Sequence, residues 1–118
     1  MIYKKRKKKF NRNSKAWKDT RVKVLIRDKY RCKICNSSTK MEVHHIIPVS
    51  VNDELALDIS NLITLCEKCH RRLRYKELVF STLFKKLVKR ELLDKLDRTL
   101  LDVLVKGRRL KIYRGIKT

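Results

Sequence analysis

The sequence predicts a small α+β domain that is stapled by a four-cysteine zinc site and flanked by helices at both ends. Three observations predict this fold class: two Cys-x-x-Cys pairs bracket the middle of the chain, two β-branched segments lie between them, and apolar residues recur at helical spacing on either side. A chain of 118 residues with 42% hydrophobic residues builds only a modest core. A metal staple would therefore contribute to its folding.

The net charge of +21 is the strongest compositional signal. An excess of this size is typical of proteins that bind a polyanion, and nucleic acid is the default partner. A membrane surface is the competing polyanion, but no apolar run approaches the roughly 20 residues that a spanning helix needs. The basic start of the chain has no apolar segment behind it, so we expect no secretory signal and a reducing, cytoplasmic setting.

The N-terminal flank is predicted to hold a basic flexible tail over residues 1–13 and then a helix from Lys15 to Asp28. The tail is rich in Lys and Arg, and either DNA contact or nuclear localisation would explain it. Ser14 is a suitable N-cap for the helix, and Trp17 lies on its apolar face. An aromatic residue in that place usually packs in a core, and stacking on bases is the alternative.

The four cysteines predict a tetrahedral zinc site. Thiolates at x-x spacing chelate one ion from a tight turn, and disulfides or free buried thiols are the alternatives. Cys32 pairs with Cys35, and Cys66 pairs with Cys69. Residues 36–65 separate the pairs, which is longer than the spacing of roughly 15–20 residues in a simple zinc ribbon, so the sequence predicts an insertion between them.

The inserted segment predicts a hairpin with a long connection. Residues 41–47 are rich in β-branched side chains and end before Pro48, which is typical of a strand whose pairing a proline stops. Residues 61–65 form the second predicted strand. Residues 49–58 are predicted as a loop with a short helical turn around residues 55–57.

A helix is predicted to begin at Cys66 and to continue through residues 71–75. Cys69 and His70 are neighbours in this helix, so their side chains point about 100° apart around its axis. Cys69 can then face zinc while His70 faces a second site. A zinc site that uses Cys66 and His70, with Cys69 spare, is the alternative.

Helical spacing continues in the C-terminal third, in apolar residues within 78–88 and 92–104. We expect one or two amphipathic helices that pack over the zinc module, and a dimer interface is the alternative. Gly107 suits a C-cap, and the basic residues 108–114 suit a phosphate contact or a short strand. The predicted organisation is a tail over 1–13, a core over 14–76 and a helical extension over 77–118.

One motif carries a specific family resemblance. Residues 42–48 read Glu-Val-His-His-Ile-Ile-Pro, and they are followed by Asn61-Leu62 and by Cys66-x-x-Cys69-His70. This pattern resembles the HNH endonuclease family, whose catalytic unit is the ββα-metal fold, and especially its zinc-stapled members from phage and bacteria. The resemblance covers about residues 17–73. It implies hydrolysis of DNA phosphodiester bonds to a 5′ phosphate and a 3′ hydroxyl, in a bacterial or phage-infected host cell.

The resemblance also implies a role for each matching residue. His45 would be the general base, and Asn61 would hold the loop that orients it by bonding to backbone. His44 and His70 would bind the catalytic divalent ion. The structural zinc would be bound by the four thiolates, those of Cys32, Cys35, Cys66 and Cys69. The arginines that follow His70 are candidates for DNA phosphate contacts, with solvated positions as the alternative; they are Arg71, Arg72 and Arg74.

The adjacent histidines carry two further expectations. Neighbouring side chains of an ideal strand face opposite ways, so His44 and His45 share a site only if the strand end twists or bulges. Many relatives have Asp in place of His44, which gives Mg²⁺ an oxygen ligand. Two imidazoles suit Mn²⁺, Ni²⁺, Co²⁺ or Zn²⁺ better, so the expected catalytic ion is Mg²⁺, Mn²⁺ or another divalent transition metal.

Two other functions fit parts of the sequence. A non-catalytic zinc module that binds nucleic acid through charge would need the cysteines and the basic residues but neither His45 nor Asn61. A subunit of a phage packaging or restriction complex would show nuclease activity only with its partner, and a homodimer would turn a nick into a double-strand break. The presence of His45 and Asn61 in the expected register favours the endonuclease.

Overall fold

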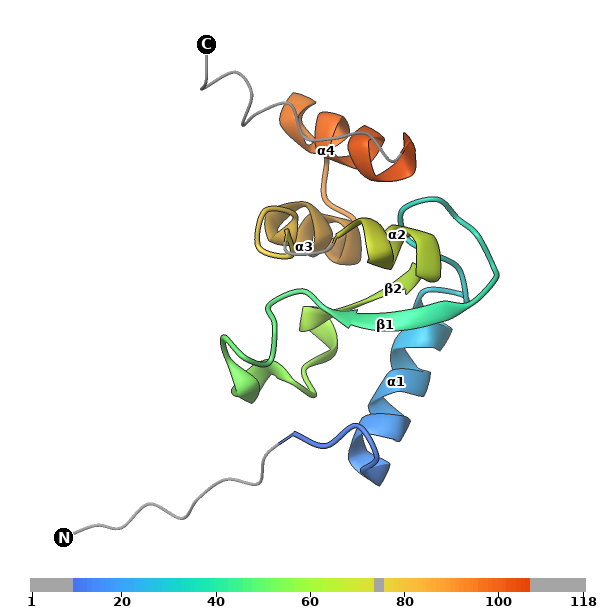
Figure 1. Cartoon of the computed structure of the whole chain (residues 1–118), viewed down its shortest axis with the longest axis vertical. Helices are drawn as coiled ribbons and strands as arrows, with labels where there is room; N and C mark the ends of the chain where they lie inside the picture. The colour runs from blue at the N-terminus through green and yellow to red at the C-terminus, as the bar shows by residue number, and fades with distance from the viewer. Residues whose placement is uncertain (1–9, 74–75, 107–118) are drawn as a thin grey trace, which may run out of the picture.

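The computed structural model describes residues 10–73 and 76–106, and they form the small α+β domain that the sequence predicts. Figure 1 shows a two-stranded sheet with helices on both sides. The elements, with η for a 3-10 helix, are α1 (Lys15–Arg27), β1 (Met41–His45), η1 (Asp53–Leu55), η2 (Ile59–Asn61), β2 (Leu62–Cys66), α2 (Glu67–Arg72), α3 (Ser81–Lys89) and α4 (Lys95–Lys106). Over the described ranges, no helix is long and apolar enough to cross a membrane.

β1 and β2 form an antiparallel hairpin, in which Met41 is opposite Cys66 and His45 is opposite Leu62. The helix α2 follows β2 directly, so the ββα order that the motif implies is present. This register places the second cysteine pair at one end of the hairpin. The adjacent histidines are at the other end.

β1 ends at His45, two residues earlier than predicted. The reason is Asn61, which ends η2 and faces the residues after the strand. Its carbonyl oxygen accepts a hydrogen bond from the Ile46 amide at 2.7 Å, and its side-chain oxygen accepts the next amide, that of Ile47, at 2.9 Å. The side chain of Asn61 therefore accepts the hydrogen bond that a strand backbone would otherwise accept from Ile47.

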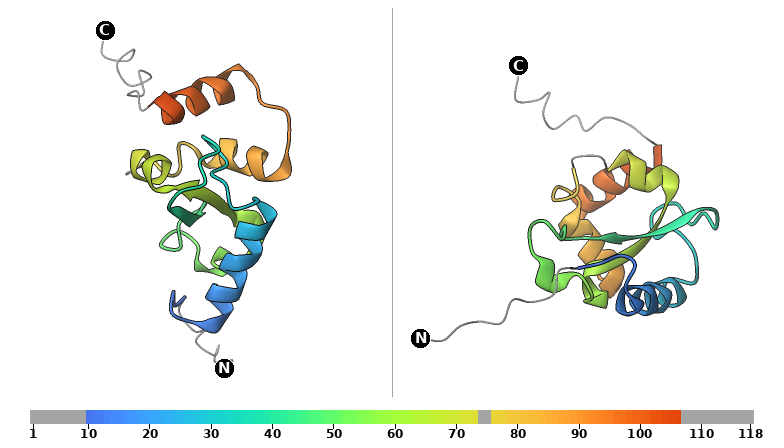
Figure 2. Two further views of the ribbon diagram at one scale, coloured as in Figure 1. Left: turned by 90° about the vertical axis from the view of Figure 1, so that its right-hand side faces the viewer. Right: turned by 60° about the horizontal axis from the view of Figure 1, so that its bottom comes forward.

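The sheet separates two apolar clusters. α1 covers one face, whereas α2 and α3 cover the other, and α4 lies outside them (Figure 2). The cluster under α1 contains Trp17, Val24, Leu25, Val43 and Leu62. The larger cluster joins the sheet and the cysteines to the C-terminal helices; its members there include Ile63, Leu65, Leu83, Phe84, Leu100 and Leu104. The predicted packing of these helices over the zinc module is thus confirmed.

The predicted helix α1 is confirmed with its cap, because the Ser14 hydroxyl accepts the Trp17 amide at 3.1 Å. Trp17 is buried, as expected of a core residue. The sequence does not predict what ties the other end of α1 to the sheet. The buried Asp28 carboxylate is bonded twice by the Arg27 guanidinium and accepts the Thr64 amide of β2 at 3.0 Å. This tie fixes the direction in which the chain enters the first cysteine pair.

The C-terminal helices are shorter than the apolar spacing predicts. α3 begins at Ser81 and ends at Lys89, and its C-cap Arg90 is in the left-handed region with φ 57°. Three of the apolar residues counted in the predicted helices are outside α3 and α4 and are exposed; they are Leu78, Val79 and Leu92. Apolar spacing alone does not show where a helix begins or ends, because its ends depend on the capping residues. The predicted C-cap Gly107 and the basic residues 108–114 lie outside the described residues.

Candidate functional site

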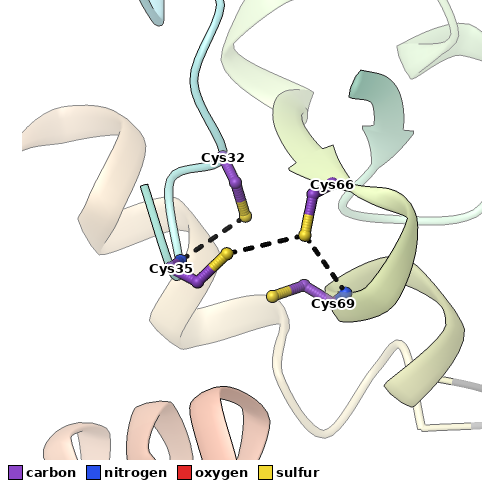
Figure 3. A group of neighbouring side chains, drawn as sticks. All are labelled: Cys32, Cys35, Cys66 and Cys69. Carbon is purple, nitrogen blue, oxygen red and sulfur yellow. Dashed lines mark hydrogen bonds between the residues drawn. The ribbon is translucent and has the colours of Figure 1, made fainter. Parts of the chain in front are cut away.

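The cysteine cluster consists of Cys32, Cys35, Cys66 and Cys69, whose sulfur atoms all lie within 4.8 Å of one another. Figure 3 shows the four side chains turned toward a common centre, two from the loop after α1 and two from the junction of β2 and α2. The Sγ atoms of Cys35 and Cys66 are 3.5 Å apart. This arrangement can hold a metal ion, and all four cysteines are free thiols.

Hydrogen bonding within the cysteine cluster has opposite effects on the pKa values of two of its thiols. The thiol of Cys69 bonds to Cys32 and lowers the pKa of Cys32 to about 4, while the same interaction raises the pKa of Cys69. Backbone amides support the thiolate form, since those of Ile34 and Cys35 lie 3.4 and 3.5 Å from the Cys32 sulfur. The cluster therefore carries negative charge at neutral pH, which suits a cation.

The three histidines line one cavity of about 650 Å³ beside the end of β1. We call this cavity the histidine pocket. Its lining also includes two arginines and two glutamates, and these are Arg12, Arg21, Glu42 and Glu77. None of the four cysteines lines it. The chain thus has a sulfur site and a separate nitrogen-lined site within the described residues.

His44 is buried against α2 and α3. Its ring centroid is 5.2 Å from that of His70 and 5.9 Å from that of Phe84. Its Nε2 atom is buried and has no hydrogen-bond partner among the described residues. Burial lowers the pKa of His44 to about 3. The ring is therefore neutral at physiological pH.

His70 is oriented by the carboxylate of Glu42, which the sequence analysis does not include among the site residues. Its Nδ1 atom lies 2.6 Å from Oε2 of Glu42, and both side chains are about half exposed. A carboxylate accepts hydrogen bonds, so the His70 proton is held on Nδ1 and the lone pair is on Nε2. Strand spacing was the available signal, because Glu42 is two residues before His44 and so shares its face of β1.

His45 faces the opposite side of the sheet. Its ring stacks on Trp17, with centroids 5.0 Å apart, and meets Phe10 edge-on at 5.1 Å. Its Nε2 atom lies 3.0 Å from the carbonyl oxygen of Ala56. Because a carbonyl can only accept, this contact places the ring proton on Nε2 and leaves the lone pair on Nδ1. Burial lowers the pKa of His45, against the smaller raising effect of this bond.

The adjacent histidines therefore reach one pocket without a bulge in β1. His44 and His45 keep the opposite directions of an ordinary strand, and the pocket extends around the end of the strand to contact both. His44 and His70 form the closer pair. The register of β1 against β2 contains no bulge, and the expected twist of the strand end stays a prediction.

Asn61 bonds to the loop that follows β1. Its side-chain nitrogen donates to the carbonyl oxygens of Ile47 at 3.1 Å and Leu55 at 3.4 Å, and its side-chain oxygen accepts the Ile47 amide. The buried amide thereby joins both ends of the loop whose Ala56 carbonyl contacts His45. The catalytic importance of this contact stays a prediction.

The three arginines after His70 differ in their surroundings. Arg71 is exposed and lies 3.9 Å from Glu67 on the same helix. Arg72 donates to the carbonyl oxygens of Leu104 and Val105 at the end of α4, at 2.6 and 2.8 Å. Arg74 lies outside the described residues. Their role in DNA binding stays a prediction, and Arg72 also has a structural contact.

Comparisons with known proteins identify similar sequences and one similar structure. Residues 32–76 match the family model described as HNH endonuclease. Anaredoxin from Nostoc sp. (strain PCC 7120 / SAG 25.82 / UTEX 2576) is 36% identical over 52 residues, which are 43% of this chain and 66% of that protein. The HNH endonuclease of the deep-sea thermophilic bacteriophage GVE2, crystallised with manganese ion, is 36% identical over 56% of this chain and 76% of its own, with a TM-score of 0.49. The chain thus spans about two thirds of the length of anaredoxin.

Proposed function

Because residues 32–76 belong to the HNH endonuclease family, we propose that the protein is a metal-dependent endonuclease that hydrolyses phosphodiester bonds of DNA. One observation carries the proposal. Three imidazoles line a single pocket that is distinct from the cysteine cluster, and the whole chain has a net charge of +21. DNA is the polyanion that this charge would attract.

The residues of the pocket fit a divalent ion. The buried Nε2 atom of His44 has no protein partner in the described chain, and the neighbouring His70 is held by Glu42 with its own Nε2 unprotonated. A histidine that donates its other nitrogen to a carboxylate is the usual arrangement around a bound metal. We assign His44 and His70 as the ligands, and neutral nitrogen donors favour Mn²⁺ or a later transition metal over Mg²⁺.

A divalent ion in that place would supply positive charge to the phosphate oxygens and to the departing 3′ oxygen. His45 acts on the other reactant. Its Nδ1 lone pair accepts a proton from the attacking water while Nε2 stays bonded to the Ala56 carbonyl, which helps to carry the resulting positive charge. The products are then a 5′ phosphate and a 3′ hydroxyl.

Asn61 acts on the reaction through His45. It fixes the loop between β1 and η2 from both ends, and that loop carries the carbonyl that sets the His45 tautomer. In this role Asn61 is a positioning residue and touches neither water nor phosphate. We assign zinc to the cysteine cluster, where four thiolates are the donor set of a structural site that builds the scaffold.

The test is cleavage of supercoiled plasmid DNA across Mg²⁺, Mn²⁺, Ni²⁺ and Zn²⁺, with His45→Ala protein beside the parent. We expect the parent to nick or linearise the plasmid and the variant to lose at least about 100-fold in rate, as loss of a general base does. The Lys18→Ala variant, changed on the exposed face of α1, serves as the control for a lost surface group.

Zinc content and thermal unfolding of all three proteins show whether the fold is intact. Undiminished cleavage by His45→Ala would remove this residue from the role of base. If the parent shifts DNA in a gel but cuts it with none of the four ions, the non-catalytic nucleic-acid-binding module becomes the better explanation.

A further inference from the structure

Arg12 lies just before α1 and lines the histidine pocket. The sequence predicts a flexible tail here, but residues 11–14 form a bonded turn. The Asn11 carbonyl oxygen accepts the Ser14 amide at 3.0 Å and the Ser14 hydroxyl at 2.7 Å, and the Asn11 side chain accepts the Asn13 amide at 2.8 Å. Ser14 is also the N-cap of α1. The backbone of Arg12 is therefore anchored to the helix that covers one face of the sheet.

Two aromatic rings hold the side chain of Arg12. Its Cζ atom is 5.5 Å from the centroid of Phe10 and 5.8 Å from that of Trp17. These rings meet edge to face at 5.1 Å, and Trp17 stacks in turn on His45. A guanidinium placed over aromatic rings has N–H donors that remain available for an oxygen ligand. Arg12 and the proposed base His45 thus both contact the ring of Trp17.

The charge of Arg12 lacks a counter-ion in the described part of the chain. Arg12 forms no salt bridge there, and of the two glutamates that line the same pocket, Glu42 is bonded to His70. Arg12 lines the same pocket as His44 and His45, so its positive charge is available to an anion that enters this pocket. A phosphodiester is an anion that the guanidinium fork can bind through two parallel hydrogen bonds.

We propose that Arg12 binds the phosphate of the DNA strand at the bond to be cut. The proposal rests on the proposed nuclease function, but it assigns a residue that precedes the segment matched by the family model. Because Arg12 and His45 are supported by the same Trp17 ring, a phosphate oxygen held by Arg12 brings the phosphorus atom to the side of the pocket where His45 activates water. The N-terminal turn is then part of the active site.

The first experiment measures DNA binding without cleavage, so that it is informative even if no cutting is found. The His45→Ala protein and its double variant with Arg12→Ala are titrated with a fluorescent DNA duplex at several salt concentrations. We expect Arg12→Ala to weaken binding several-fold and to reduce the salt dependence by about one released counterion. Arg98→Ala in the same background is the matched control, because Arg98 is exposed on α4 and does not line the pocket.

The second experiment measures single-turnover cleavage at saturating DNA, with His45 intact. Arg12→Ala is expected to lower the rate roughly 10- to 100-fold, as removal of one donor to a developing charge does, while Arg98→Ala cuts like the parent. Arg12→Lys keeps the charge but loses the planar fork, so its rate is expected between those of the parent and Arg12→Ala.

The outcomes separate this proposal from the nuclease function. A fall in DNA affinity or in single-turnover rate that Arg98→Ala does not share supports phosphate binding by Arg12. If Arg12→Ala binds and cuts like Arg98→Ala, the proposal is overturned while the nuclease function stands. If the parent does not cut DNA, the DNA-binding titration alone shows whether Arg12 binds phosphate. A Mn²⁺ titration completes the test, because weaker ion binding by Arg12→Ala would indicate that Arg12 acts on the histidines and would overturn phosphate binding.

Discussion

The cysteine cluster and the histidine pocket lie at opposite ends of one hairpin and are assembled in different ways. The cysteine cluster takes its four sulfur atoms from two tight turns, each of which carries an entire Cys-x-x-Cys pair. The histidine pocket collects groups from the turn before α1, from α1 itself, from β1, from the loop after it and from α2. The difference teaches that local spacing specifies the cysteine cluster, whereas the histidine pocket depends on how distant elements pack.

Replacing neighbouring residues of α2 is the strongest way to break this comparison. Cys69 is buried in the cysteine cluster, whereas the next residue, His70, lies in the histidine pocket. We expect Cys69→Ser to abolish zinc binding and the cooperative unfolding transition, since binding of a structural zinc supplies much of the folding free energy of a small domain. His70→Ala is expected to keep both. Zinc analysis and calorimetry of the two proteins provide the measurement.

A loss of zinc from the His70→Ala protein would contradict this division. It would place His70 among the ligands of the sulfur site, which is the alternative that the sequence leaves open. The Glu42 contact argues against that alternative, because it holds the His70 ring over β1 and toward His44.

The contrast also explains which features could be predicted from the sequence. The four cysteines, Ser14 as N-cap and the ββα order follow from local spacing and cap chemistry, and the structure confirms each. The bond between His70 and Glu42 joins a helix to a strand, so it depends on hairpin register and on the docking of α2. Sequence spacing alone shows that Glu42 shares a face with His44 but not which residue it meets.

The N-terminal turn is a second feature that local sequence patterns do not predict. Charge patterning predicts a tail over residues 1–13, because a run of Lys and Arg without apolar period resists packing. Phe10 nevertheless meets Trp17 and His45. A single aromatic residue at the edge of a basic run carries too little periodic signal to predict this contact. The buried tie from Asp28 to Thr64 is missed for a similar reason, since its partners are far apart in the sequence.

A smaller change sharpens the comparison within the histidine pocket. We expect Glu42→Ala to weaken Mn²⁺ binding roughly 10- to 100-fold, because the carboxylate orients His70 and increases its basicity. Glu42→Gln keeps an acceptor oxygen without the charge, so its affinity is expected to fall between those of the parent and Glu42→Ala. Calorimetric titration with Mn²⁺ measures the affinities, and zinc content should be unchanged in both variants.

Glu77→Gln is the matched control for this experiment. Glu77 also lines the pocket, so its removal tests whether any carboxylate there attracts the ion equally. Equal losses for the Glu42 and Glu77 variants would mean that the pocket attracts Mn²⁺ by overall charge, and orientation of His70 would then have no special part.

The smallest expected effect concerns stability against pH. Burial lowers the pKa of His44 to about 3 in the folded chain, whereas an unfolded histidine titrates near 6.5. The unfolded state therefore takes up a proton first as pH falls, and stability is lost through the window from about 6.5 toward 3. One such proton lowers the free energy of unfolding by about 2 kcal/mol between pH 7.5 and 5.

Urea unfolding of the parent and of His44→Gln across this pH range measures the contribution. Both proteins keep the cysteine cluster, so acid release of zinc affects them alike and the difference between their slopes isolates His44. We expect the variant to lose less stability on acidification than the parent. Equal slopes would mean that His44 is protonated in the folded chain, and a charged ring could not offer its Nε2 lone pair to an ion. The acid sensitivity of the fold is thus a measure, independent of cleavage, of the state that metal binding at the histidine pocket requires.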